Sequence, residues 1–101
     1  MANDSDILRR LRFIEWLKAE LAAHLAALLH ALAKNSERAI AEALAGLVVT
    51  SYVLARRLGL DFEKLDGEIG AWLARYSAKE HDVDKWTADY AELERYLNRK
   101  R

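Results

Sequence analysis

The sequence has no cysteine and no proline, only four glycines, and no excess of charge of either sign. Without cysteine the chain can form no disulfide, thiolate zinc site or cysteine nucleophile, and it fits a cytoplasmic protein. Sixteen basic residues balance sixteen acidic ones, which argues against a general DNA- or RNA-binding protein. Long apolar runs are also missing, because charged residues or histidine interrupt them, so we expect no membrane-spanning segment.

Alanine and leucine are abundant instead, with 18 and 17 copies in 101 residues. This composition favours helices and argues against β-sandwiches, β-barrels and disordered tails. The length suits one domain. We therefore predict a soluble, all-α protein with a single domain over residues 1–101, which has a polar N-terminus (1–5) and a basic C-terminal end (98–101).

Two long helices are predicted in the N-terminal half. Asp4 or Ser5 can cap the first, and its apolar positions recur over about 28 residues, roughly 40 Å of helix. Ser36 can cap a second helix that runs from about Glu37 to Leu58, and Gly59 can end it in the left-handed conformation. The apolar positions are Ile7, Leu11, Ile14, Leu21, Leu25, Leu28 and Leu32, then Ile40, Leu44, Leu47, Val48, Leu54 and Leu58.

Two shorter helices are predicted in the C-terminal half. Asp61 can cap the first of them, in which Gly67 and Gly70 are weak points. A polar connection over 77–82 precedes the last helix, whose apolar stripe comprises Val83, Trp86, Tyr90, Leu93 and Leu97. We expect the two long helices to form an antiparallel hairpin and the two short ones to complete a four-helix bundle.

The histidines and acidic residues of the long helices are the candidates for chemistry. Glu20 and His24 are four apart, so they share a helix face and could bind one metal together. The ordinary alternative for His24 is a partly buried ring that is hydrogen-bonded to a carboxylate, and His30 should lie on a different face. The acidic pairs are spaced by five residues, Glu15 with Glu20 and Glu37 with Glu42, and neither pair shares a face.

Several segments, in their order and spacing, resemble the small bacterial MazG-like proteins. They are RFIEWLKAEL (12–21), ALA (43–45), YVLARRLGLDF (52–62), KLDGEI (64–69) and EHDVDKW (80–86). The resemblance implies an all-α fold of the MazG nucleotide pyrophosphohydrolase type, normally a dimer or a dimer of dimers. Active relatives hydrolyse nucleoside triphosphates to monophosphates and pyrophosphate, using Mg²⁺ held by a Glu-x-x-Glu pair and a Glu-x-x-Asp pair, because the metal neutralises phosphate charge and activates water.

The resemblance places the second ligand pair at Ala43 and Gly46, which cannot bind a metal. Glu42 is adjacent to Ala43 but points about 100° away. The first pair corresponds to Glu20 and Ala23, of which only Glu20 is acidic. The resemblance therefore implies that the metal ligands have been lost at Ala23, Ala43 and Gly46.

The remaining candidate metal ligands are Glu20 and Glu42, with Glu15 or His24, and no catalytic residue can be assigned. We expect a non-catalytic helical oligomer that binds a nucleotide or a protein and has no cofactor. The alternative is a divergent Mg²⁺-dependent nucleoside triphosphate pyrophosphohydrolase that uses Glu20, Glu42 and groups from a partner subunit.

Two further expectations concern packing. The long helices carry apolar residues beyond the stripes given above: Leu8, Trp16, Leu29, Val49 and Val53. Because monomers rarely expose large apolar patches, we expect a homodimer or a homotetramer. Gly46 lies in mid-helix, and we expect it to mark close helix packing because Ala45 and Leu47 look buried.

Overall fold

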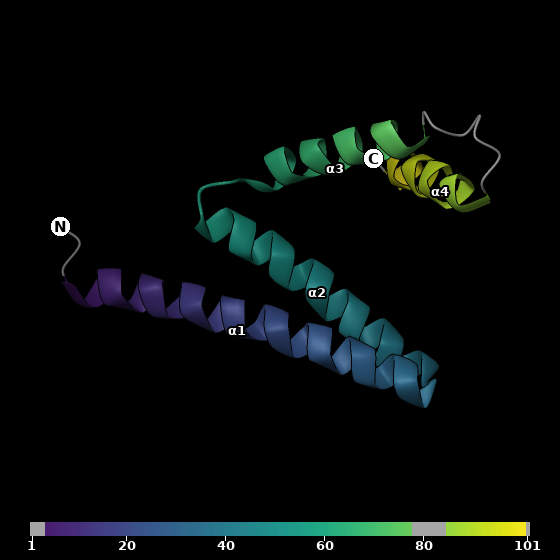
Figure 1. Cartoon of the computed structure of the whole chain (residues 1–101). Coiled ribbons are helices and arrows are strands. Elements are labelled where there is room, and N and C mark those ends of the chain that lie inside the picture. The colour runs from purple at the N-terminus through teal and green to yellow at the C-terminus, as the bar shows by residue number, and fades with distance from the viewer. Residues whose placement is uncertain (1–3, 78–84, 101) are drawn as a thin grey trace. The chain divides into compact units, whose positions relative to one another are not determined.

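The computed structural model describes residues 4–77 and 85–100 (Figure 1). Within these ranges the chain forms four α-helices and no strand: α1 (Asp4–Lys34), α2 (Glu37–Arg57), α3 (Phe62–Ser77) and α4 (Lys85–Lys100). The predicted all-α class is confirmed. The helices group into two compact units, Met1–Asp61 and Phe62–Arg101, which are described separately below, and the single domain stays a prediction.

The turn between α1 and α2 is two residues long and is built from backbone hydrogen bonds. Asn35 has a left-handed backbone with φ 56°, and its N–H donates to the Leu32 carbonyl at 3.2 Å. The Ser36 N–H donates to the Ala31 carbonyl at 3.2 Å, which completes a Schellman motif. The Ser36 side chain then accepts from the Ala39 N–H at 3.4 Å, so Ser36 is the N-cap of α2 as predicted.

The C-terminal end of α2 repeats the same motif with glycine. Gly59 has φ 90°, and its N–H donates to the Arg56 carbonyl at 3.1 Å, while the Leu60 N–H donates to the Ala55 carbonyl at 2.8 Å. The predicted role of Gly59 as a helix stop is confirmed. Phe62 begins α3 directly after Asp61, the residue predicted to cap it.

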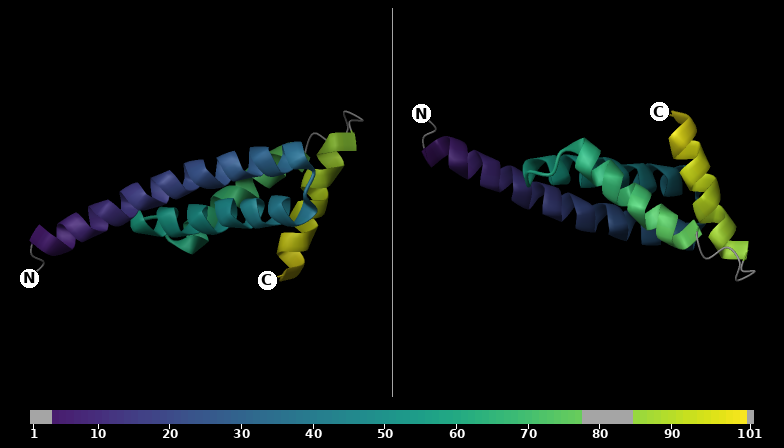
Figure 2. Two further views of the ribbon diagram at one scale, coloured as in Figure 1. Left: turned by 90° about the horizontal axis from the view of Figure 1, so that it is seen from below. Right: turned by 90° about the horizontal axis from the view of Figure 1, so that it is seen from above.

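α1 and α2 form the predicted antiparallel hairpin and lie side by side in all the views (Figures 1 and 2). The Arg57 guanidinium lies 4.9 Å from the centre of the Phe13 ring, and Gly46 contacts His24. His24 follows Phe13 by eleven residues and Gly46 precedes Arg57 by eleven, which is three helical turns on each helix. The two helices therefore keep one register between these pairs.

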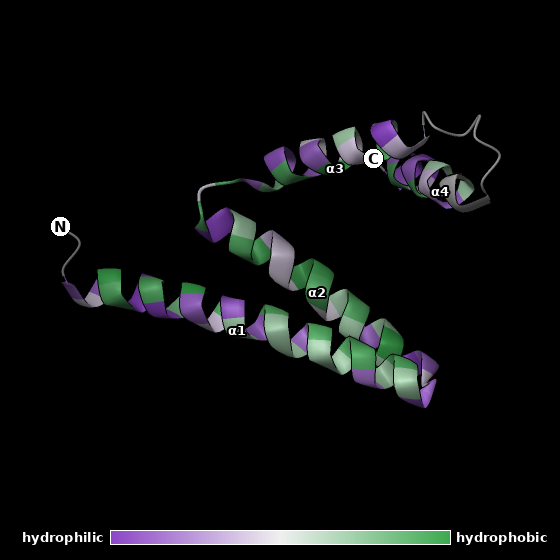
Figure 3. Ribbon diagram, viewed as in Figure 1, coloured by the Kyte–Doolittle hydropathy of each residue, from purple (hydrophilic) through white to green (hydrophobic). Residues whose placement is uncertain are grey.

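Mostly small residues are buried in this hairpin, apart from Leu17: they are Ala31, Ala43, Thr50 and Ala55. Alanine brings two helix backbones closer together than leucine does. The predicted stripe on α1 is only partly correct, because Leu17, which lies outside it, is 3% exposed, whereas Leu11 is 54% exposed. Apolar residues lie on more than one side of both helices (Figure 3).

The N-terminal part of α1 extends past the end of α2 (Figures 1 and 2). Phe13 contacts Arg57, the last residue of α2, so α1 continues beyond the helical end of α2, where the side chains of Arg56 and Arg57 still line clefts with Arg9 and Arg10. This overhang holds exposed Ile7, Leu8 and Leu11 together with three arginines.

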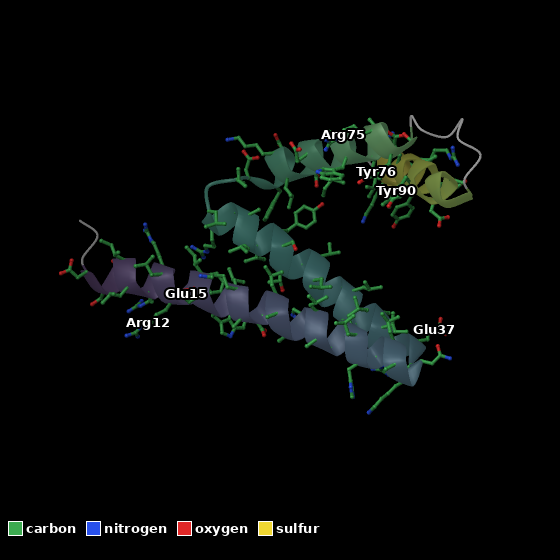
Figure 4. The ribbon with its side chains drawn as sticks, in the orientation of Figure 1. Arg12, Glu15, Glu37, Arg75, Tyr76 and Tyr90 are labelled. Atoms are coloured by element: carbon green, nitrogen blue, oxygen red, sulfur yellow. The ribbon has the colours of Figure 1, made fainter. Side chains whose placement is uncertain are left out.

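The α3–α4 unit is joined by aromatic stacking. The ring centres of Tyr76 and Tyr90 lie 4.7 Å apart at 18°, and Figure 4 shows the two side chains facing each other. Trp72 also stacks on Tyr76, with ring centres 5.5 Å apart, and Ser77 Oγ donates to Glu94 Oε1 at 3.3 Å. Of the apolar stripe predicted for the last helix, Val83 and the side chain of Trp86 lie outside the described residues. The connection predicted over 77–82 is wrong at Ser77, which is the last residue of α3, and its other residues lie outside the described ranges.

α2 alone is long and apolar enough, by length and composition, to cross a membrane, among the residues that the structure describes. The charged residues and histidines that interrupt the apolar runs had predicted no such segment. One helix of this kind is weak evidence for a span, and 17% of its most apolar window is buried inside the structure. α2 also lies along α1 and begins at a polar cap.

Candidate functional site

The resemblance places the second ligand pair at Ala43 and Gly46, and the face of α2 that holds these positions is turned toward α1. Ala43 is 4% exposed and Thr50 is 8% exposed, and Gly46 lies between them on the same face of α2. A Cβ atom added at Gly46 would lie 2.5 Å from both Cε1 and Nδ1 of His24 and 2.9 Å from its Cγ. A side chain at this position would force the His24 ring to move, so the predicted close packing at Gly46 is confirmed.

The reason given for that packing was wrong. Ala45 is exposed and Leu47 is half-buried, so neither flanking residue holds Gly46 in a core. The close contact comes from the other helix, where the His24 imidazole lies against the backbone of α2. No hydrogen bond joins His24 to a carboxylate among the described residues, so the ring is placed by packing rather than by the predicted polar partner.

A cleft of about 660 Å³ lies beside this contact, at the turn end of the hairpin. Its walls are mainly the short side chains of Ala27, Ala31, Ala39 and Ala43, which leave the space open. Its polar lining consists of His24, His30, Lys34, Ser36 and Glu42. The two histidines were expected on different faces of α1, yet both line this cleft because it is wide enough to take in neighbouring faces.

The predicted metal ligands do not come together. His24 and Glu42 line the same cleft, whereas Glu15 and Glu20 do not. The carboxylate of Glu15 is 66% exposed and pairs with Lys18 Nζ at 2.7 Å, and Figure 4 shows Glu15 along α1 near Arg12. In the described part of the chain, no group of three His, Cys, Asp or Glu side chains could hold a metal ion.

Sequence reasoning missed the cleft and the place of His30 and Lys34 in its lining. Part of the cleft could have been predicted, because alanines spaced three and four apart on both helices indicate helix faces with short side chains. The register between the helices, which decides which alanines face each other, was not available.

The sequence profile of the MazG-like family matches residues 7–90 of the chain. The chain belongs to the MazG-like family. No curated protein and no solved structure matches it. In this MazG-like chain the two positions expected to hold the second ligand pair, Ala43 and Gly46, are used to bring two helices together.

Proposed function

We propose that this MazG-like chain is a helical oligomer that has lost metal-dependent hydrolysis and acts as a non-catalytic module that binds a nucleotide or a protein. The observation that carries the proposal is the contact of His24 with Gly46. The Cβ atom of an acidic residue at position 46 would lie in the space that the imidazole of His24 fills. Position 46, where the resemblance places a metal ligand, therefore serves helix packing in this chain.

The chemistry of Mg²⁺ supports the same proposal. Mg²⁺ demands octahedral coordination by oxygen and is usually held in proteins by carboxylates, together with water and phosphate oxygens. Ala23, Ala43 and Gly46 offer no side-chain oxygen, and the remaining acid on the cleft, Glu42, stands beside two histidines and a lysine. One carboxylate cannot neutralise and position a triphosphate through two metal ions.

The binding role rests on the cleft at the turn end of the hairpin. A volume of about 660 Å³ lies within the usual range of small-molecule sites, and the lining combines apolar methyl groups with a few polar side chains. The same lining would also suit a partner's side chain.

The oligomer rests on the exposed apolar residues of the hairpin. On α1 and α2, large apolar side chains from 46% to 60% exposed include Leu11, Leu25, Leu29, Leu32, Leu44, Val48 and Val49. Burying such residues against a second copy is favourable by roughly 25 cal/mol for each Å² of apolar surface. A homodimer or a homotetramer follows from this as a proposal.

The test is a pyrophosphate-release assay on the pure protein with a panel of nucleoside triphosphates and Mg²⁺ or Mn²⁺. We expect no release above buffer, while an active pyrophosphohydrolase in parallel reactions shows that the assay works. Metal-dependent release that disappears in Glu20→Ala or Glu42→Ala would overturn the proposal and establish the divergent enzyme.

A further inference from the structure

A second polar site lies at the open end of the α1–α2 hairpin, away from the alanine-walled cleft. Two neighbouring clefts, of about 460 Å³ and 260 Å³, share Arg10 and Arg57 in their linings. Arg9 lines the first and Arg56 lines the second. Phe13 and Ile14 provide the apolar walls, and Asp6 is the only carboxylate among the described residues that line them.

The arrangement concentrates like charge. Four guanidinium groups face one carboxylate, and Asp6 and Arg56 also take part in other contacts. The C-terminal end of a helix favours cations, so the α2 terminus accounts for Arg56 and Arg57. It does not account for Arg9 and Arg10, which lie in the second turn of α1, near the helix end that favours anions.

One of these arginines is held in place. The Arg57 guanidinium lies over the ring of Phe13 at 4.9 Å, and Phe13 in turn stacks on Trp16 with ring centres 5.8 Å apart. An arginine held over an aromatic ring can still donate hydrogen bonds from its N–H groups. Less side-chain entropy is then lost when those groups bind a ligand.

We propose that this arginine cluster, comprising Arg9, Arg10, Arg56 and Arg57, binds phosphate groups of a multiply charged anion. Guanidinium forks match the spacing of phosphate oxygens and donate two hydrogen bonds to each group. A polyanion also lowers the repulsion among the four guanidinium groups. The site goes beyond the proposed function, because it shares no lining residue with the alanine-walled cleft.

The experiment measures binding of phosphate from two sources to the full chain. Calorimetry with sodium tripolyphosphate tests a free anion, and co-sedimentation with phosphatidylcholine vesicles, with and without phosphatidic acid, tests a lipid headgroup. Arg10→Gln and the Arg10→Gln/Arg57→Gln double variant are compared with Arg38→Gln, an exposed arginine in the first turn of α2 that lines neither cleft. Circular dichroism melting shows whether each variant folds.

We expect saturable binding of at least one probe, weakened about tenfold by Arg10→Gln, which is the loss of one charge-assisted hydrogen bond, and weakened further in the double variant. Arg38→Gln should bind like the unmodified chain. Binding of tripolyphosphate assigns the site to a free anion, and binding only of vesicles with phosphatidic acid assigns it to a lipid. Absence of binding to either probe, or equal weakening by Arg38→Gln and Arg10→Gln, overturns the proposal.

Discussion

The imidazole of His24 occupies the space in which the side chain of any residue other than glycine at position 46 would begin. Three ring atoms lie within 3 Å of that position, including Cγ, so a small rotation of the ring does not open it. The two residues come from different helices and fix how closely α1 and α2 approach each other.

Gly46→Ala is therefore expected to destabilise the protein. Alanine gains about 1 kcal/mol in helix propensity over glycine, but overpacking costs about 1–3 kcal/mol, and the clash with His24 places this site at the upper end. Urea denaturation should show a net loss of roughly 2 kcal/mol in the free energy of unfolding. A His24→Ala/Gly46→Ala double variant should regain the loss, and a more stable Gly46→Ala single variant would contradict the packing interpretation.

Asn35 provides a test of the turn between the long helices. Its φ of 56° costs most residues about 1–2 kcal/mol, a cost that glycine avoids. Asn35→Gly should leave the melting temperature unchanged or raise it, and Asn35→Ala should lower it. The matched control is Ala33→Gly, on an exposed helical position two residues earlier, where glycine should cost about 1 kcal/mol. Equal effects of glycine at positions 33 and 35 would exclude a role for the left-handed turn.

Magnesium should not stabilise the protein. A cation that binds only the native state raises its stability by mass action. Because Ala43 and Gly46 stand at the expected ligand positions, we predict no change in melting temperature with millimolar Mg²⁺. Differential scanning fluorimetry with Mg²⁺, and with EDTA as the metal-free reference, makes the measurement. A rise that Glu20→Ala or Glu42→Ala removes would count against the non-catalytic proposal.

The oligomer is tested by light scattering at micromolar concentration. We expect a species of at least twice the 11.5 kDa chain mass. Leu25→Lys and Leu29→Lys, on side chains that are 49% and 60% exposed, should lower the measured mass by placing charge in the interface. Ala74→Lys, on an exposed position of α3, is the control and should not. A stable species of 11.5 kDa in the unmodified chain would contradict the proposal.

The helix ends could be predicted because they depend on local chemistry. Ser36 and Gly59 act within a few residues of their own position, so the sequence around each determines its role. The left-handed conformation of Asn35 was not predicted. Asparagine is less specific for that conformation than glycine is.

The packing face of α1 could be predicted only in part. Hydrophobic spacing marks leucines, but the face of α1 that lies against α2 is chosen by fit. On α1, Ala31 is buried, whereas Leu25 and Leu32 of the predicted stripe are 49% and 53% exposed. The cleft escaped prediction for the same reason. Its lining depends on the register of two helices, and that register depends on contacts such as His24 with Gly46, which no local pattern reveals.

The two-residue turn between α1 and α2 has a consequence for the order in which the hairpin forms. The entropic cost of closing a loop increases with the number of residues between the contacting groups. His24 and Gly46 are separated by 22 residues along the chain, and Phe13 and Arg57 by 44. We therefore expect the hairpin to close from the turn outward, with the arginine cluster assembled last and opening first in native-state hydrogen exchange.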